Sequence, residues 1–352
     1  MRNTRRSRLA PRTTPCSTSA PAFDWLMAGL AVWLLGGAYV DGWAHTHGRA
    51  DTSFFTPWHA LLYAGFLAVA VTCAVRLIRS LARRQAWWQG LPPGYQLSLL
   101  GVGVFWLGGV GDLAWHSWFG IEKDVEALLS PTHLLLAAGA WLIAGGPFRA
   151  AWQRRASPED VRLWQCLPCW VSLTCMLSAC TFILQIAHPV ASPWGGGPSQ
   201  TLPVLRHVTG VVSALCDAGL LMGFLLLAMR RWLLPPGTLT LVIGLNAAAM
   251  GFVLAGPYPF GLVLVRCLAA GLLDIVYALL QPTLQRPWAW RLFAFLLPVC
   301  LSAAHFGALA LGGVLWWSVH LWTGTVALTG VVGVFLSFLL LPPVLPMPPE
   351  AV

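Results

Sequence analysis

Two short groups of aspartate and histidine residues recur in the first part of the chain. In each copy an aspartate and a histidine lie four residues apart, and a second histidine follows within a Thr/Ser-Pro-x-His group. The first copy consists of Asp41, His45 and His59, and the second of Asp112, His116 and His133. Carboxylates and imidazoles are ligands that zinc and copper accept in proteins. The two copies therefore predict a metal-binding function.

The spacing within each copy suits a helical hairpin. Residues i and i+4 of a helix lie on one face, about 5–6 Å apart at Cβ, so Asp41 and His45 would converge. Thr56 and Ser130 suit the N-cap of the following helix, with proline at its first position. The second histidine then falls in the first turn, where the positive helix end favours the neutral imidazole that a metal needs. We expect copper or zinc, in one dinuclear or two mononuclear sites.

Other interpretations of the motif remain open at this stage. An aspartate and a histidine at a membrane interface can simply pair with each other or cap a helix end. Further ligands are also conceivable, and the candidates are Glu126, His305 and His320. His188 and His207 are weaker candidates of the same kind.

The motif resembles a known copper site. An Asp-x3-His pair followed by a histidine on the next helix is similar to the copper-binding motif in the C subunit of particulate methane and ammonia monooxygenases. Asp41, His45 and His59 match that motif with one extra residue in the second gap, and the copy that begins at Asp112 has three extra. The resemblance implies copper or zinc and not the oxidation of alkanes or ammonia. The whole chain is similar to a family of bacterial polytopic membrane proteins.

The elements that position these residues are predicted to be transmembrane helices. The chain has 352 residues, of which 57% are hydrophobic and 9% charged, whereas soluble domains carry about 25% charged residues. Apolar runs of about 20 residues match the length of a membrane-crossing helix. We predict an all-α polytopic transmembrane bundle with a duplicated helical hairpin in its N-terminal half. Its ten spans would be residues 22–43, 57–78, 95–118, 131–148, 165–187, 206–229, 236–255, 259–280, 291–312 and 316–341.

Basic residues predict the orientation. Of the 21 basic residues, 17 fall in the N-terminal tail and the even-numbered connections, and cytoplasmic loops are enriched in Lys and Arg. Both termini would then lie in the cytoplasm, in the bacterial inner membrane, and all nine histidines would lie at or near the outer face. The expected divisions are a disordered basic tail (1–21), the duplicated hairpin region (22–148), the remaining bundle (149–341) and a cytoplasmic tail (342–352).

A few polar groups fall inside the predicted spans. Asp217 and Arg266 lie at similar depths and are expected to form an ion pair, which Asn246 could join. Asp274 lies two turns beyond Arg266, nearer the cytoplasm. A proton or ion path along these residues is the alternative. The Cys166-Leu-Pro-Cys169 sequence is expected to serve packing and not redox chemistry.

Three functional hypotheses follow from the sequence. The first is an integral membrane metalloprotein with an outward-facing Asp/His copper or zinc site, which could be a metal-dependent enzyme. The second is a transporter or metal-handling protein that captures an ion at the outer cluster, with Asp217, Arg266 and Asp274 along its route. The third is a b-type haem protein with histidines on facing helices. Membrane lipid is the expected partner. Nucleic acid is not expected, because the membrane topology explains the arginines, and ATP is not expected, because the sequence has no phosphate-binding loop.

Overall fold

The described part of the chain is entirely helical, as the sequence predicts. A computed structural model describes residues 21–49, 55–86, 89–120, 128–154, 163–196, 203–254 and 257–342. Within these ranges β-structure is limited to one isolated bridge between Gly196 and Leu315. The predicted tails, 1–21 and 342–352, lie almost wholly outside the described residues.

The helices agree with the predicted spans. Eight are long and apolar enough to cross a membrane, α5 and α6 counting as one, and α7 and α9 are shorter apolar helices. In chain order the helices are α1 (Ala22–Thr46), α2 (Pro57–Ala82), α3 (Gln96–Phe119), α5 (Pro131–Ala144), α6 (Gly146–Gln153), η2 (Leu163–Cys166), α7 (Leu167–Ile183), η3 (Gln185–Ala187), α8 (Pro203–Arg231), α9 (Thr238–Leu254), α10 (Pro257–Leu280), α11 (Pro287–Leu311) and α12 (Val319–Leu340). The described chain is therefore an all-α polytopic bundle.

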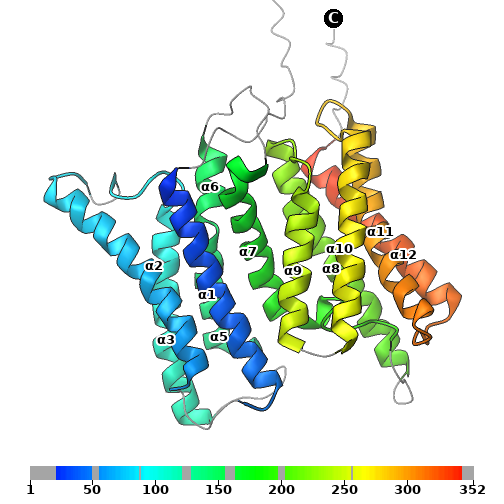
Figure 1. Ribbon diagram of the computed structural model, residues 1–352, viewed down its shortest axis with the longest axis horizontal. Helices are drawn as coiled ribbons and strands as arrows, with labels where there is room; N and C mark the ends of the chain where they lie inside the picture. The colour runs from blue at the N-terminus through cyan, green and yellow to red at the C-terminus, as the bar shows by residue number, and fades with distance from the viewer. Residues whose placement is uncertain are drawn as a thin grey trace, which may run out of the picture.

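The helices are arranged along the long axis of one bundle. Figure 1 shows α1, α2, α3 and α5 at one side, α10, α11 and α12 at the other, and α7 and α9 between them. Consecutive helices pair most extensively as α1 with α2, α3 with α5, and α11 with α12. The two metal-ligand motifs therefore both fall in the N-terminal side of the bundle.

Glycines bring the two helices of the first hairpin close together. A Cβ added to Gly37 of α1 would lie 2.6 Å from Cα of Leu62 in α2, and one on Gly65 would lie 3.0 Å from Cα of Leu34. Small residues let helix backbones approach closely in membranes, where packing drives association. These contacts fix the spacing between the end of α1 and the beginning of α2.

The second hairpin makes the same contacts at equivalent positions. A Cβ on Gly139 of α5 would lie 2.6 Å from the backbone nitrogen of Phe105, and one on Gly108 would lie 2.9 Å from that of Leu136. Gly108 precedes Asp112 by four residues, as Gly37 precedes Asp41. The glycines thus hold both pairs of motif-bearing helices in one geometry.

Candidate metal centre

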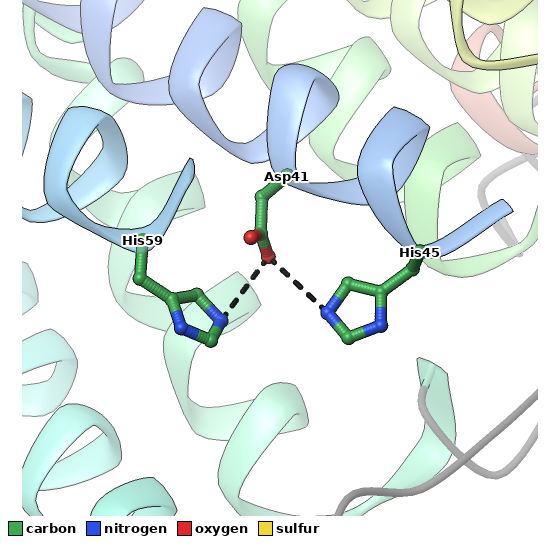
Figure 2. Close-up of side chains that lie close together, drawn as sticks. All are labelled: Asp41, His45 and His59. Carbon is green, nitrogen blue, oxygen red and sulfur yellow. Dashed lines mark ion pairs between the residues drawn. The ribbon is translucent and has the colours of Figure 1, made fainter. Parts of the chain in front are cut away.

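The first three predicted ligands form a compact group, the first triad, where α1 ends and α2 begins. The Oδ2 atom of Asp41 lies 3.8 Å from Nε2 of His45 and 3.5 Å from Nε2 of His59 (Figure 2). One ligand atom from each residue lies within 4.8 Å of the others. Helix α1 continues through Thr46, which places Asp41 and His45 on one helix face. The predicted convergence is therefore present.

Local structure positions the third member of this triad. The Thr56 hydroxyl accepts a hydrogen bond of 3.1 Å from the backbone N–H of His59, and Pro57 occupies the first position of α2. This is the predicted N-cap. The other oxygen of Asp41, Oδ1, is buried and has no hydrogen-bond partner among the described residues. A buried carboxylate oxygen without a partner is costly, and a bound ion would relieve that cost.

The second triad repeats this arrangement between α3 and α5. The Oδ1 atom of Asp112 lies 3.5 Å from Nε2 of His116 and 3.3 Å from Nε2 of His133. Ser130 caps α5 by accepting from the backbone N–H of His133. Asp112 is 1% exposed, so its charge is almost fully removed from solvent. Its only ion-pair contacts among the described residues are these two imidazoles.

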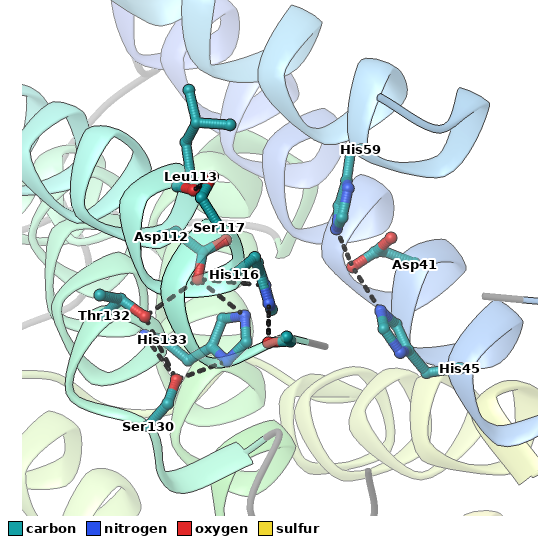
Figure 3. Close-up of polar contacts among 11 residues, drawn as sticks. Asp41, His45, His59, Asp112, Leu113, His116, Ser117, Ser130, Thr132 and His133 are labelled. Atoms are coloured by element: carbon teal, nitrogen blue, oxygen red, sulfur yellow. Dashed lines mark hydrogen bonds and ion pairs between the residues drawn. The ribbon is translucent and has the colours of Figure 1, made fainter. Parts of the chain in front are cut away.

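A chain of hydrogen bonds fixes the tautomer of His133 (Figure 3). The Thr132 hydroxyl donates to Asp112 Oδ1 over 2.9 Å, so its single proton is used there. Ser130 Oγ lies 3.3 Å from the Thr132 oxygen and must donate to it. Ser130 therefore accepts from Nδ1–H of His133 over 2.8 Å. In a neutral imidazole the proton is then on Nδ1, and Nε2 presents its lone pair to Asp112.

The tautomer of His116 follows in the same way. Its Nδ1 atom lies 3.2 Å from the carbonyl oxygen of Gly120, which can only accept, so Nδ1 carries the proton. Two imidazole lone pairs and a carboxylate oxygen of Asp112 thus converge with no proton between them when both imidazoles are neutral. Hydrogen bonds from Nδ1 to a carbonyl or hydroxyl are the usual outer support of metal-binding histidines.

The separations within the triads match ligands around one ion. Four distances between Nε2 and carboxylate oxygen run from 3.3 to 3.8 Å, longer than the 2.7–3.2 Å of ordinary N–H···O hydrogen bonds. Ligands at about 2.0–2.1 Å from zinc in tetrahedral geometry are about 3.3 Å apart. The distances are therefore compatible with ligands that share one ion.

The two triads are separate but close neighbours. Each forms its own group of three ligand atoms, and no residue belongs to both groups. In Figure 3 the two triads lie on facing sides of the same region. The described candidate ligands thus form two sets of three, one in each hairpin.

The further candidate ligands do not join these groups within the described chain. Glu126 lies outside the described residues. His305 donates from Nε2 to the carbonyl oxygen of Trp194 over 3.2 Å in the C-terminal side of the bundle. His320 is exposed near the beginning of α12. Cys166, from the CxxC sequence, accepts a hydrogen bond from the indole of Trp170, in agreement with a packing role.

The two aspartates inside the spans both have partners among the described residues. Arg266 donates to both carboxylate oxygens of Asp217 at 3.0 Å, which confirms the predicted ion pair. Asp274 instead accepts from the backbone N–H groups of Leu239 and Thr240 and so caps the N-terminus of α9. It is a capping group within the bundle and does not continue the Asp217–Arg266 pair.

Asn246 belongs to a different cluster from the one predicted for it. It hydrogen-bonds the hydroxyls of Ser178 and Thr181 and lies 3.2 Å from Nε2 of His188. His188 is fully buried and accepts from the backbone N–H of Val190. Burial and, next, the charge of Arg266 lower the pKa of His188 well below its usual value. These contacts describe a neutral structural histidine.

Sequence reasoning missed two supports of the candidate sites. The first is the Ser130–Thr132 hydroxyl chain, whose signal was the hydroxyl at the x position of Ser-Pro-x-His. The second is the set of glycine contacts, which stand four residues before each aspartate and six after each second histidine. Both signals are present in the sequence, but only the packing of the helices reveals their role.

The comparisons with known proteins add no assignment. No protein-family model, no curated protein and no solved structure matches this chain.

Proposed function

We propose that this chain is an integral membrane metalloprotein that binds copper or zinc at two Asp/His sites, one in each N-terminal hairpin. The observation that carries the proposal is the convergence of three acceptors in the second triad. The Nε2 atoms of His116 and His133 lie 3.5 and 3.3 Å from Oδ1 of Asp112, and both Nδ1 protons are used elsewhere. Acceptors repel unless a cation lies between them, and Asp112 has no Lys or Arg partner among the described residues.

With three protein ligands, each site would be of the reactive kind and not of the closed structural kind. Structural zinc sites are closed by four protein ligands, whereas catalytic sites use three and leave one position open. Each triad supplies three from the described residues. With copper or zinc bound, the open position would accept water, or dioxygen in the case of copper.

The two alternative functions are less well supported. An ion route through the bundle would use the carboxylates as ligands, but Asp217 is paired with Arg266 and Asp274 caps α9. In both triads a carboxylate oxygen lies 3.3–3.8 Å from both imidazole nitrogens. That oxygen occupies the space that a porphyrin would need between two axial histidines.

We further propose that the sites face the outer side of the bacterial inner membrane, with both termini in the cytoplasm. The proposal rests on the asymmetry of the basic residues. A reporter active only in the periplasm should be silent when fused after Arg84 or Arg155 and active when inserted near Asp51 or Lys123. The reverse pattern would contradict the outward orientation.

Metal content tests the proposed function. Protein purified without a histidine tag and loaded with zinc or copper should bind about two ions per chain by elemental analysis. His59→Ala and His133→Ala should each remove about half, and the double variant nearly all. A loss well above half in each single variant would indicate one dinuclear site. Unchanged metal content in the double variant, with intact gel filtration in detergent, would refute the proposal.

A further inference from the structure

An apolar groove begins at the first triad and runs between α2 and α3. Its volume is about 620 Å³, within the usual range for sites that bury a small organic molecule. One end is formed by Thr56 and His59, and the walls continue through Tyr63 and Phe66. From His59 to Phe66 the helix rises about 10 Å, at about 1.5 Å per residue. The groove therefore leads from His59 along α2, away from the triad end of the helix.

The wall contributed by α3 is apolar and open to the side. It consists of Phe105, Trp106, Gly109, Val110 and Leu113. Trp106 is 57% exposed and Val110 52% exposed, and both lie in a helix long and apolar enough to span the membrane. What faces such side chains in a bilayer is hydrocarbon. The groove is therefore open to the acyl region of the membrane along this side.

The polar groups of the groove gather at the triad end. Apart from the indole of Trp106, the polar side chains that line it are those of Thr56, His59 and Tyr63, and the ring of Tyr63 lies 6.4 Å from that of His59 and 6.1 Å from that of Phe105. No ligand of the second triad lines the groove. A molecule in the groove would thus have its apolar part against Phe66 and Phe105 and any polar end at the first triad.

We propose that the groove binds the hydrocarbon chain of a membrane amphiphile and brings its polar head to the first triad. The occupant is a single-chain lipid with an anionic or hydroxyl head, such as a fatty acid, that enters sideways from the bilayer. This inference rests on the proposed function for the role of the head group, since an anionic head would take the open position of the bound metal. The hydrocarbon part depends only on the shape and composition of the groove.

Photolabelling tests the hydrocarbon part. The probe is palmitic acid with a diazirine near its methyl end, added to the full chain in lipid nanodiscs, and the labelled peptides are identified by mass spectrometry. Label should concentrate on the stretches of α2 and α3 that line the groove. Ala60 lines the groove and is exposed, so Ala60→Trp should fill it and remove more than half of that label. Ala64→Trp is the matched control, because Ala64 is also exposed on α2 but does not line the groove.

If Ala60→Trp fails to fold by gel filtration, Val110→Trp fills the groove from the α3 side. Label spread evenly over the lipid-facing helices, or label in the groove that the filling variant leaves unchanged, would overturn the inference.

The head-group part is tested on the same samples. With zinc loaded, the free acid should label the groove several-fold more than its methyl ester, and His59→Ala should remove that difference. Equal labelling by acid and ester in zinc-loaded wild type would overturn the head-group contact. Zinc content is measured in parallel, and Ala60→Trp should retain it. Groove labelling without bound zinc would mean that the proposed function fails while chain binding stands. Bound zinc with uniform labelling would mean that chain binding in the groove fails while the proposed function stands.

Discussion

Replacement of Asp112 by asparagine should have opposite effects on the metal-free and the metal-loaded protein. The new amide would keep an oxygen that accepts from Thr132 but would carry no charge. In the metal-free protein a carboxylate that is 1% exposed and lacks a Lys or Arg partner among the described residues is unfavourable. Removing its charge should raise the free energy of unfolding by about 1–3 kcal/mol.

When zinc is bound, wild type should instead be more stable than Asp112→Asn. At free zinc one thousand times the Kd, each occupied site stabilises the folded state by about 4.1 kcal/mol, which exceeds the gain of about 1–3 kcal/mol that the variant has without metal. Asp112→Asn should lose that gain at the second site and keep it at the first. The assay is thermal unfolding in detergent across a series of free zinc concentrations, for wild type and variant.

Asp24→Asn is the matched control for this experiment. Asp24 is also buried, at 2% exposure, but it pairs with Arg154 and accepts from the hydroxyl of Tyr95. Its replacement should destabilise the protein equally with and without zinc. If Asp112→Asn instead destabilises the metal-free protein and leaves the zinc-induced shift intact, Asp112 is paired with protonated imidazoles and the metal-site argument is refuted.

Three further outcomes follow from the packing and the buried polar groups. Gly139→Leu should separate α5 from α3 and abolish metal binding at the second site in elemental analysis, because a Cβ there meets backbone at 2.6 Å. Gly103→Leu is the control, since a Cβ there meets nothing within 4 Å, and this variant should bind metal normally. Equal metal binding by the two variants would contradict the close approach of α3 and α5. Asp217→Asn alone should lower the free energy of unfolding, measured with denaturant, by about 3–5 kcal/mol, and adding Arg266→Gln should restore part of that loss. If the effects of the two single changes simply add, the residues do not interact as a pair. The pKa of His188 is lowered in the folded state, so the unfolded chain takes up its proton first as pH falls. The stability from this group is therefore full above about pH 6.5 and is lost below it, by up to about 1.4 kcal/mol per pH unit; His188→Gln should be less stable at pH 7.5 and show a flatter decline in melting temperature towards pH 5, and an unchanged slope would contradict this.

The helices and the two triads were predictable from sequence for simple physical reasons. Apolar runs of membrane length admit only helices, and the i, i+4 spacing of Asp41 and His45 brings them to one helix face. The Thr-Pro and Ser-Pro pairs predicted the N-caps that place His59 and His133 in first turns. Local sequence rules therefore sufficed to place the Asp–His pair on one helix and the second histidine on the next.

Contacts between helices that are distant in sequence were harder to predict. The ion pair of Asp217 with Arg266 was predicted because equal depth in the membrane is a one-dimensional property. Asn246 and Asp274 were harder, since their partners depend on how α7, α9 and α10 are rotated about their axes. The groove between α2 and α3 depends in the same way on the packing of two hairpins, which no local pattern encodes.

X-ray absorption at the zinc edge of the loaded, full-length protein tests the central claim most directly. We predict nitrogen and oxygen ligands at about 2.0–2.1 Å, with the outer-shell scattering of two imidazoles per zinc and no sulfur at about 2.3 Å. His59→Ala should leave only the second site occupied and keep that spectrum at about half the zinc content. A sulfur shell would locate the metal at the cysteines, and a spectrum of hydrated zinc without imidazole scattering would contradict binding by the two triads.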